Sequence, residues 1–376
     1  MKAILISGAG IAGPTLAFWL KAAGFEPTLV ERAPALRRGG YVIDFWGLGY
    51  DIAERMGLIA EVNRIGYQAR EMRIVDDRGH SVAGFGARVF AELTSGRYVT
   101  LARSDLSRLL FERLKGTVEV IFDDEIVGLE ERSDGVRVQL RQAGERQFDL
   151  VVGADGLHSV VRKLAFGPQQ RFEKDLGYIV AAFEAGGYRP RDEDVYLMYG
   201  QPGRMVGRFT LRDDRTLFLF VFATADDPLP AALDRQKDML RREYAAGKWE
   251  CPAILAELDR AAEVYFDRVS QIRMTDWSKG RIVLLGDAAF CVSLLAGQGS
   301  ALAMISAYVL AGELAAAGGQ YRQAFDNYEA RLRSFIETKQ RAPNALPAPL
   351  RRRPVGALVF AIRWSRHFRF PGLGGS

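Results

Sequence analysis

A glycine-rich turn near the N-terminus constrains the fold more than any other feature of this chain. Residues 2–7 predict a short apolar strand, residues 11–23 carry apolar residues at helical spacing, and residues 26–30 predict a second strand. Three glycines between the first strand and the helix follow the spacing G-x-G-x-x-G: Gly8, Gly10 and Gly13. Glycine lets the backbone turn tightly and approach a pyrophosphate, which then lies against the free amides of the helix N-terminus. The sequence therefore predicts a βαβ unit that binds a dinucleotide.

The end of the second strand supplies the next part of this predicted site. Glu31 stands where an acid usually accepts hydrogen bonds from the adenosine ribose, and we include the adjacent Arg32 among the predicted cofactor-binding residues. The glycine fingerprint alone does not distinguish NAD from FAD. A glycine turn with a purely structural role is the alternative.

Two later motifs resolve the choice of dinucleotide. GADGLHSVVR places Asp155 just after a predicted strand at 150–152, with Arg162 one helical stretch further on. RIVLLGDAA places Asp287 at the end of another strand, and AGQGSALAMISAYVLAGEL begins a long helix at 297–299. The three motifs, in this order, resemble the para-hydroxybenzoate hydroxylase family, the class A flavin monooxygenases, over nearly the whole chain.

Within that family the sequence is most similar to the tetracycline destructase branch, through GAGIAGPTLAFWLKAAGFEPTLVERA, RRGGYVIDFWG, DWSKGRIVLLGDAAFC and GQGSALAMISAYVLAGEL. The resemblance implies FAD as cofactor, NADPH or NADH as reductant and molecular oxygen as co-substrate. In the family, a flavin C4a-hydroperoxide transfers one oxygen atom to an electron-rich ring, and the protein supplies orientation and shelter from water. It implies hydroxylation of a polycyclic or phenolic aromatic small molecule, tetracycline-like compounds included.

The resemblance also implies roles for individual residues. Asp287 would accept hydrogen bonds from the ribityl chain, Arg103 would contact the FAD backbone, and Asp44 would lie near the isoalloxazine. The N-terminus of the helix after the third motif would lie at the pyrimidine edge of the flavin, where its positive end favours the anionic reduced form; its residues are Gly297, Gln298 and Gly299. No catalytic side chain is assigned, because the cofactor carries the chemistry.

Each assignment has a simpler alternative. Asp287 could be a helix cap, Arg103 could pair with Asp105, Asp155 could serve a local turn with Arg162, and Asp44 could be a surface acid. Two enzymatic or binding alternatives remain at the level of function. One is a flavin reductase or dehydrogenase with the same fold, and the other is a ligand-sequestering flavoprotein with slow turnover.

The segment between the second and third motifs departs from the family pattern. Relatives often have His and one or two prolines after GDAA, whereas residues 290–296 read FCVSLLA. The absence of proline predicts a looser loop beside the flavin. Ala301 and Ser306 also stand where many relatives carry Asn and Asp. Cys291 is interpreted as a small packed residue.

The predicted architecture is α/β, a Rossmann-like FAD-binding domain with an inserted antiparallel-sheet substrate domain and C-terminal helices. We expect residues 1–172 and 273–318 to form the FAD-binding domain, 173–272 the substrate domain and 319–376 a helical C-terminal segment. Strand alternation allows about half of the aromatic and apolar residues of the inserted sheet to face a substrate cavity; the candidates are Phe183, Tyr196, Met198, Phe209, Phe218 and Phe220.

Composition excludes several other classes of protein. Eight of the 51 Lys and Arg residues lie from residue 338 onward, where no acid occurs, so the rest of the chain is near neutral and nucleic-acid binding is not indicated. Three scattered histidines and two cysteines predict no metal site and a reducing, cytoplasmic location. We expect no membrane-spanning segment and a monomer or weak homodimer. For residues 354–370, packing of a final helix is favoured over a membrane-surface role.

Overall fold

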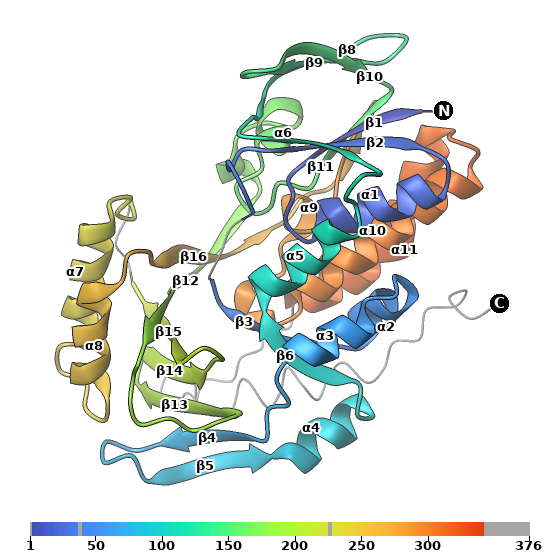
Figure 1. The fold of residues 1–376 in the computed structure, drawn as a ribbon. Helices are drawn as coiled ribbons and strands as arrows, with labels where there is room; N and C mark the ends of the chain where they lie inside the picture. The colour runs from blue at the N-terminus through green and yellow to red at the C-terminus, as the bar shows by residue number, and fades with distance from the viewer. Residues whose placement is uncertain (1, 37–39, 225–227, 342–376) are drawn as a thin grey trace. The chain divides into compact units, whose positions relative to one another are not determined.

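The computed structural model describes residues 2–36, 40–224 and 228–341 (Figure 1). These residues divide into two compact units. The first contains residues up to 67, 99–178 and 268–341, and the second contains residues 68–98 and 179–267. The chain therefore passes from one unit to the other four times, and all the predicted cofactor-binding residues belong to the first unit.

A six-stranded sheet with the order β17-β18-β11-β1-β2-β7 forms the centre of the first unit. Its strands are β1 (Ala3–Ser7), β2 (Glu26–Glu31), β7 (Glu119–Phe122), β11 (Leu150–Gly153), β17 (Ser278–Lys279) and β18 (Ile282–Leu284). All neighbouring pairs are parallel except β17 with β18. Such sheets bury both faces, and the continuous apolar runs of β1, β11 and β18 meet that requirement.

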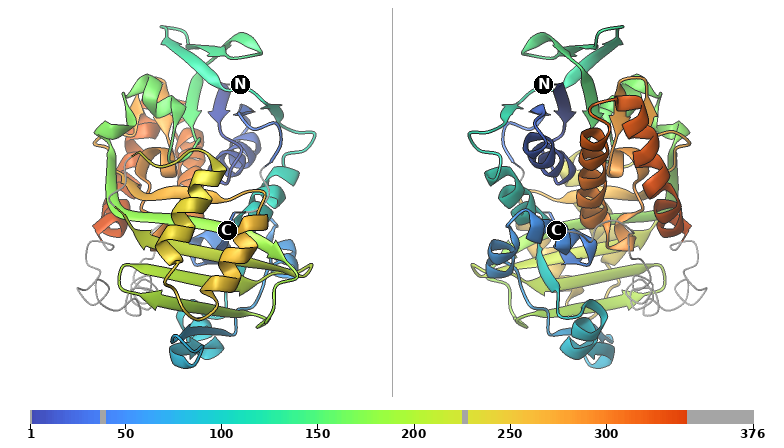
Figure 2. Two further views of the ribbon diagram at one scale, coloured as in Figure 1. Left: turned by 90° about the vertical axis from the view of Figure 1, so that its left-hand side faces the viewer. Right: turned by 90° about the vertical axis from the view of Figure 1, so that its right-hand side faces the viewer.

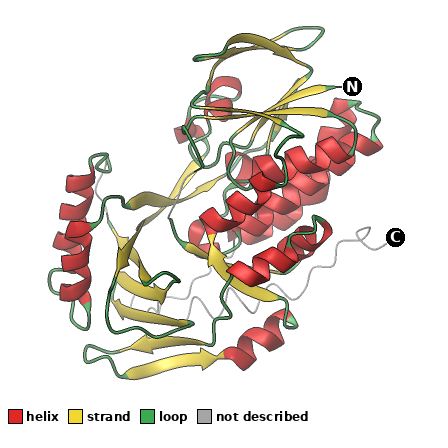
Figure 3. Ribbon diagram, viewed as in Figure 1, coloured by secondary structure: helices red, strands yellow, loops and turns green. Residues whose placement is uncertain are grey.

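Helices and two small sheets complete the first unit. α10 packs against α1, α2 and α11 (Figure 3). The helices are α1 (Ala12–Ala22), α2 (Leu48–Arg55), α3 (Ile59–Ile65), α5 (Arg103–Glu112), α6 (Val160–Ala165), α9 (Asp287–Phe290), α10 (Gly299–Ala316) and α11 (Tyr321–Arg341), with 3-10 turns η1 (Gln169–Arg171) and η2 (Leu294–Ala296). The small sheets pair β3 (Val42–Trp46) with β6 (Tyr98–Ala102), and β8 (Ile126–Glu131), β9 (Val136–Leu140) and β10 (Gly144–Phe148) with one another.

The second unit is built on a seven-stranded sheet with the order β16-β12-β15-β14-β13-β4-β5, of which residues 173–178 and 268–272 belong to the first unit. Its strands are β4 (Glu71–Val75), β5 (Ser81–Gly86), β12 (Glu173–Gly186), β13 (Val195–Gln201), β14 (Arg204–Thr210), β15 (Arg215–Ala223) and β16 (Tyr265–Ile272). α7 (Leu233–Tyr244) and α8 (Cys251–Arg260) lie side by side (Figure 2), and their buried residues share one apolar cluster with the strands. α4 (Ala87–Thr94) follows β5.

The α/β architecture with an inserted sheet is confirmed, and the structure adds one feature that the sequence did not predict. Residues 68–98, expected within the first FAD-binding segment, contribute β4, β5 and α4 to the second unit. β13 pairs antiparallel with β14 but parallel with β4, so the inserted sheet is mixed. β4 pairs with the nearby β5 on one side, but its partner on the other side, β13, is more than a hundred positions away, and local pattern does not reveal such pairing.

α10 bears on the expectation of no membrane-spanning segment. By length and composition this 18-residue helix could cross a membrane, with a mean hydropathy of 1.4. However, 61% of that window is buried inside the protein, as in the core helix of a globular fold. Its apolar character on all sides therefore follows from its enclosure in the first unit. The segment 354–370 lies outside the described residues.

Candidate cofactor site

The glycine turn between β1 and α1 leaves no room for side chains at two of its three glycines. Gly8 has φ +106°, and a Cβ there would lie 2.6 Å from the carbonyl oxygen of Ala154. A Cβ on Gly13 would lie 1.9 Å from the carbonyl oxygen of Gly8. At Gly10 the nearest atom to an added methyl group is the Arg103 Nη2, at 3.7 Å. Gly8 and Gly13 are thus required by the fold itself, whereas Gly10 faces open space that a ligand can occupy.

The N-terminus of α1 is open above this turn. Its N-cap residue, Ile11, has no hydrogen-bonding side chain, and its first turn contains no acid. The turn is held from below by Ser107 on α5, whose hydroxyl donates to the carbonyl of Gly10 at 3.1 Å. Free amides at the positive end of a helix, approached through glycine, fit a pyrophosphate.

Glu31 at the end of β2 is tied to the same turn. Its Oε2 accepts a hydrogen bond from the amide of Ala9 at 2.8 Å, and its Oε1 accepts one from the amide of Ala33 at 3.0 Å. Each carboxylate oxygen has a further lone pair with which it can accept a ribose hydroxyl. The neighbouring Arg32 is exposed. β2 therefore places a carboxylate beside the glycine turn.

Asp287 lies at the carboxyl end of β18, as the first residue of α9. Burial raises the pKa of its carboxyl group, while the Arg103 guanidinium and a hydrogen bond with Cys291 partly offset that effect. Its Oδ1 is 3.9 Å from the position of a Cβ built on Gly299, the first residue of α10. Asp287 is not the N-cap residue of α9, which is Gly286. The structure thus groups Gly10, Arg103, Asp287 and Gly299.

The start of α10 is a second open helix N-terminus. Gly297 adopts a left-handed conformation with φ +64°, and Gln298 is the N-cap residue. Within the described part of the chain, Gln298 makes no side-chain cap hydrogen bond and the first turn has no acid. The aligned peptide dipoles of this 18-residue helix place its positive end here. This terminus therefore favours a negatively charged group.

Asp44 and Asp155 both have protein partners. Asp44 on β3 accepts a hydrogen bond from the hydroxyl of Thr100 at 2.9 Å. Asp155 accepts bonds from the Ser159 hydroxyl at 2.5 Å and from the amides of Val160 and Val161 at 2.8 and 3.1 Å. Burial raises the pKa of Asp155, against the effect of these bonds. The carboxylate of Asp155 caps α6, and a direct contact with cofactor stays a prediction.

The loop between Asp287 and Gly297 contains an unusual backbone conformation. Ser293 has φ +95° and ψ 141°, a region that residues other than glycine rarely adopt. Its hydroxyl accepts a hydrogen bond from the amide of Leu295 at 3.2 Å. Sequence reasoning missed Ser293, as well as Ser107 below the glycine turn, because neither has a motif of its own.

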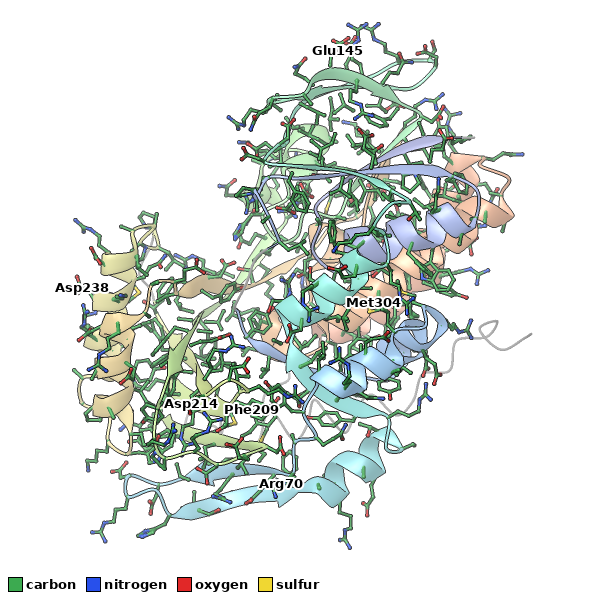
Figure 4. The ribbon with its side chains drawn as sticks, in the orientation of Figure 1. Arg70, Glu145, Phe209, Asp214, Asp238 and Met304 are labelled. Carbon is green, nitrogen blue, oxygen red and sulfur yellow. The ribbon has the colours of Figure 1, made fainter. Side chains whose placement is uncertain are left out.

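The inserted sheet divides the six aromatic and apolar candidates evenly. Phe183, Phe218 and Phe220 belong to the cluster packed with α7 and α8. Strand alternation puts the other three on the opposite face: Tyr196, Met198 and Phe209 (Figure 4 labels Phe209). Tyr196 and Phe209 are register partners, with ring centroids 4.5 Å apart. Of the second group, Tyr196 and Met198 are partly exposed and remain available to line a substrate site, whereas Phe209 is buried.

A polar hollow of about 830 Å³ is separate from these residues. It belongs to the second unit and is lined by β4, β5, Asp192, Glu193, Val195 and Arg70 (Figure 4 labels Arg70). It contains none of the predicted cofactor-binding residues, and it is polar and open. The chemistry therefore does not point to this hollow as the flavin site.

Comparison with known proteins agrees with the site geometry. A family described as FAD binding domain matches residues 1–341. An uncharacterised protein of Mycobacterium tuberculosis is 38% identical over 358 residues, covering 93% of this chain and 96% of the relative. A flavin-dependent monooxygenase of Legionella longbeachae is 34% identical over 351 residues, covering 90% and 87%. The crystal structure of tetracycline destructase Tet(55) aligns with a TM-score of 0.85 at 30% identity, covering 99% of this chain and 98% of that one.

The fold, the two open helix termini and these matches define an FAD-dependent oxidoreductase of the monooxygenase class. The chain belongs to the FAD-binding-domain family that contains the class A flavin monooxygenases.

Proposed function

We propose that the protein hydroxylates a polycyclic or phenolic aromatic compound, using NADPH or NADH as reductant and molecular oxygen. The observation that carries this proposal is the grouping of Gly10, Arg103, Asp287 and Gly299 in one unit, with open helix termini at α1 and α10. A dinucleotide such as FAD is elongated and has a charged pyrophosphate at its centre, so it needs binding groups at several separate points. When bound, FAD would supply the redox chemistry, which consists of oxidation of the nicotinamide and activation of molecular oxygen.

The residues of this chain would hold FAD at four points. The amides of α1 and the Arg103 guanidinium would bind the pyrophosphate, and Glu31 would accept the adenosine ribose. Asp287 would accept hydrogen bonds from the ribityl hydroxyls. Asp44, on the small sheet beside Thr100, would lie near the isoalloxazine. These roles follow from the family resemblance and are supported by the geometry described above.

The start of α10 is the chain's main electrostatic contribution to the reaction. The amides of Gln298 and Gly299, after the left-handed turn at Gly297, would stabilise negative charge on the pyrimidine edge of the reduced flavin. Since these amides are already oriented, no reorganisation is needed when the charge develops.

The apolar sheet face supports an aromatic substrate. Tyr196 and Met198 are partly exposed, and Phe209 lies beside Tyr196. Aromatic rings pack well against such side chains through offset stacking and sulfur contacts. Relatives include tetracycline destructases, so we propose tetracycline-like polycyclic compounds as the first candidates. We also propose a monomer or weak homodimer, and a cytoplasmic location, in keeping with two buried cysteines that do not form a disulfide.

A substrate screen tests the proposal. The protein, supplied with FAD, is incubated with NADPH or NADH and a panel of phenols and polycyclic aromatics that includes tetracyclines. Stimulation of nicotinamide oxidation by a panel member, together with a hydroxylated product, is the expected result. Nicotinamide oxidation without any product would favour the reductase alternative, and tight ligand binding without turnover would favour the sequestering protein.

A further inference from the structure

Two buried glutamine side chains hold the backbone that follows Asp287. The Nε2 of Gln340, in the last turn of α11, shares one of its two hydrogens between the carbonyl oxygens of Phe290 at 3.4 Å and Cys291 at 3.2 Å. The Nε2 of Gln271, near the end of β16, donates to the carbonyl of Val292 at 3.2 Å. Three successive carbonyls of the loop are therefore bound by side-chain amides from two other elements.

The two glutamine side chains also join the end of β16 to the end of α11. Gln271 Nε2 donates to the backbone carbonyl of Gln340 at 2.9 Å, and Gln340 Nε2 donates to the carbonyl of Ile272 at 2.7 Å. Arg273 donates to the Oε1 of Gln271 through Nε at 3.0 Å and Nη2 at 2.7 Å. Arg273 orients the side-chain amide of Gln271. Because Arg273 binds the Oε1 of this amide, the Nε2 must face the carbonyls of Val292 and Gln340.

Burial makes this network costly unless it has a use. Gln271 is 0% exposed and Gln340 is 6% exposed. A buried amide without hydrogen-bond partners strongly destabilises the folded state. An apolar side chain of the same size would fill the space without that desolvation cost. The feature that apolar residues cannot reproduce is donation to the carbonyls of residues 290–292.

The position of the loop gives the network its consequence. It begins at the end of α9, three residues after Asp287, and leads through the strained Ser293 to Gly297. Strained backbone persists only where its surroundings fix it. The loop has no proline, so fixation comes from hydrogen bonds in place of ring constraints. At residues 290–292 these hydrogen bonds act against the looseness that the absence of proline predicts.

We propose that Gln271 and Gln340 are positioning residues, which set the loop so that Asp287 and the N-terminus of α10 meet the flavin together. The inference rests on the proposed FAD site. It assigns neither glutamine a contact with cofactor or substrate. Their effect on FAD passes through the carbonyls of Phe290, Cys291 and Val292.

The test is FAD binding by the apo-protein, followed through the visible absorption of the flavin as it is titrated. Gln340→Leu and Gln271→Leu remove the donors at similar volume, and each should weaken FAD binding about tenfold. Tyr244→Phe is the matched control. It removes a buried hydroxyl whose one hydrogen is within reach of the carbonyls of Met205 and Val221 in the second unit, and FAD affinity should stay within about twofold of wild type.

Gln340→Glu supplies a readout that packing alone would not move. An ionised carboxylate cannot donate to the carbonyls, whereas its protonated form can donate one hydrogen bond. The FAD affinity of this variant, relative to wild type, should therefore recover as pH falls, while the ratio for Gln340→Leu stays constant. If Gln340→Leu does not fold, the FAD affinities of Gln340→Glu and Gln271→Leu test the positioning role in its place.

The outcomes separate the two levels of the proposal. Wild type that binds no FAD contradicts the proposed cofactor site and this inference with it. Wild type that binds FAD, with both leucine variants and Gln340→Glu equal to it at every pH, overturns the positioning role and leaves the cofactor site standing. Equal weakening in the Tyr244→Phe control would show a general loss of folding, and would also overturn it.

Discussion

At the scale of single residues, Asp287 carries opposing demands of folding and binding. Burial raises the pKa of its carboxyl group in spite of Arg103 and Cys291, so ionised Asp287 destabilises the cofactor-free protein. An acid whose pKa is raised by folding contributes stability below its ordinary pKa. That contribution is lost as pH rises through the ordinary value towards the raised one. Ribityl hydroxyls would supply the hydrogen bonds that the ionised group lacks.

Asp287→Asn should therefore weaken FAD binding by about 1.5 to 3 kcal/mol and raise the melting temperature of the apo-protein at neutral pH. The gain in stability should shrink below the ordinary pKa of aspartate. Flavin titration and thermal melts of the apo-protein measure the two effects.

Asp124→Asn is the control. Burial acts to raise the pKa of Asp124, but backbone hydrogen bonds from Ala143, Gln142, Glu125 and Arg141 outweigh it and the pKa is lowered. Loss of the Asp124 carboxylate should lower the melting temperature of the apo-protein at neutral pH and leave FAD affinity unchanged. If Asp287→Asn behaved in the same way, Asp287 would be a structural residue.

Gly10 and Gly13 should respond differently to alanine. A methyl group on Gly13 meets the Gly8 carbonyl at 1.9 Å, so Gly13→Ala should fold poorly. A methyl group on Gly10 meets only the Arg103 Nη2 at 3.7 Å among the described residues, so Gly10→Ala should keep a wild-type melting temperature. It should nevertheless lose FAD affinity, because the pyrophosphate approaches the backbone there. Retained affinity in Gly10→Ala would place the pyrophosphate elsewhere.

The residues that sequence reasoning found differ in kind from those it missed. Gly8, Gly10, Gly13 and Asp287 belong to local motifs whose spacing is set by one turn, so they can be read from the chain. Gln271 and Gln340 are 69 residues apart and act on a third segment. Nothing local distinguishes them from surface glutamines, and only the packed structure shows their burial.

At the scale of elements, the contact of α2 with α10 explains one departure from the family pattern. A Cβ on Gly49 of α2 would lie 2.8 Å from the Cβ and 2.9 Å from the Cα of Ala301. The two helices therefore approach closely through small residues. A larger residue at 301 has little room next to α2, which accounts for alanine where many relatives carry Asn.

Gly49→Ala should lower the free energy of unfolding by about 1 to 3 kcal/mol, because the helices must separate to admit the methyl group. Gly312→Ala, on exposed α10 backbone with nothing within 4 Å of the added Cβ, should raise it by about 0.4 to 1 kcal/mol. Denaturant unfolding of both variants measures the difference. A neutral Gly49→Ala would mean that α2 and α10 are not closely packed.

The helix expected at residues 11–23 is α1, which differs from that range by one residue at each end, and the long helix expected to begin at 297–299 is α10. β4, β5 and α4 were not predicted. Their strands depend on a parallel neighbour, β13, far along the chain, and an exposed edge strand such as β5 has no buried alternation to reveal it. Non-local pairing, more than weak propensity, accounts for these omissions.

At the scale of the whole molecule, family membership establishes an FAD-dependent monooxygenase, and the aromatic substrate is our proposal. The N-terminal and C-terminal parts of the sequence meet in the first unit, where β1, β11 and β18 are neighbours. The motifs that follow these strands lie at one edge of the sheet because parallel strands bring their carboxyl ends together there. The substrate could not be predicted, since the sheet face that supports it is specified by shape and apolar character alone.

Incorporation of isotopically labelled molecular oxygen tests the central claim most directly. The protein is incubated with FAD, NADPH and the compound that best stimulates nicotinamide oxidation, under labelled dioxygen in unlabelled water. Our account predicts one labelled atom in the hydroxylated aromatic product and the other in water. Label that enters the product from labelled water in the reciprocal experiment, with none from dioxygen, would contradict it.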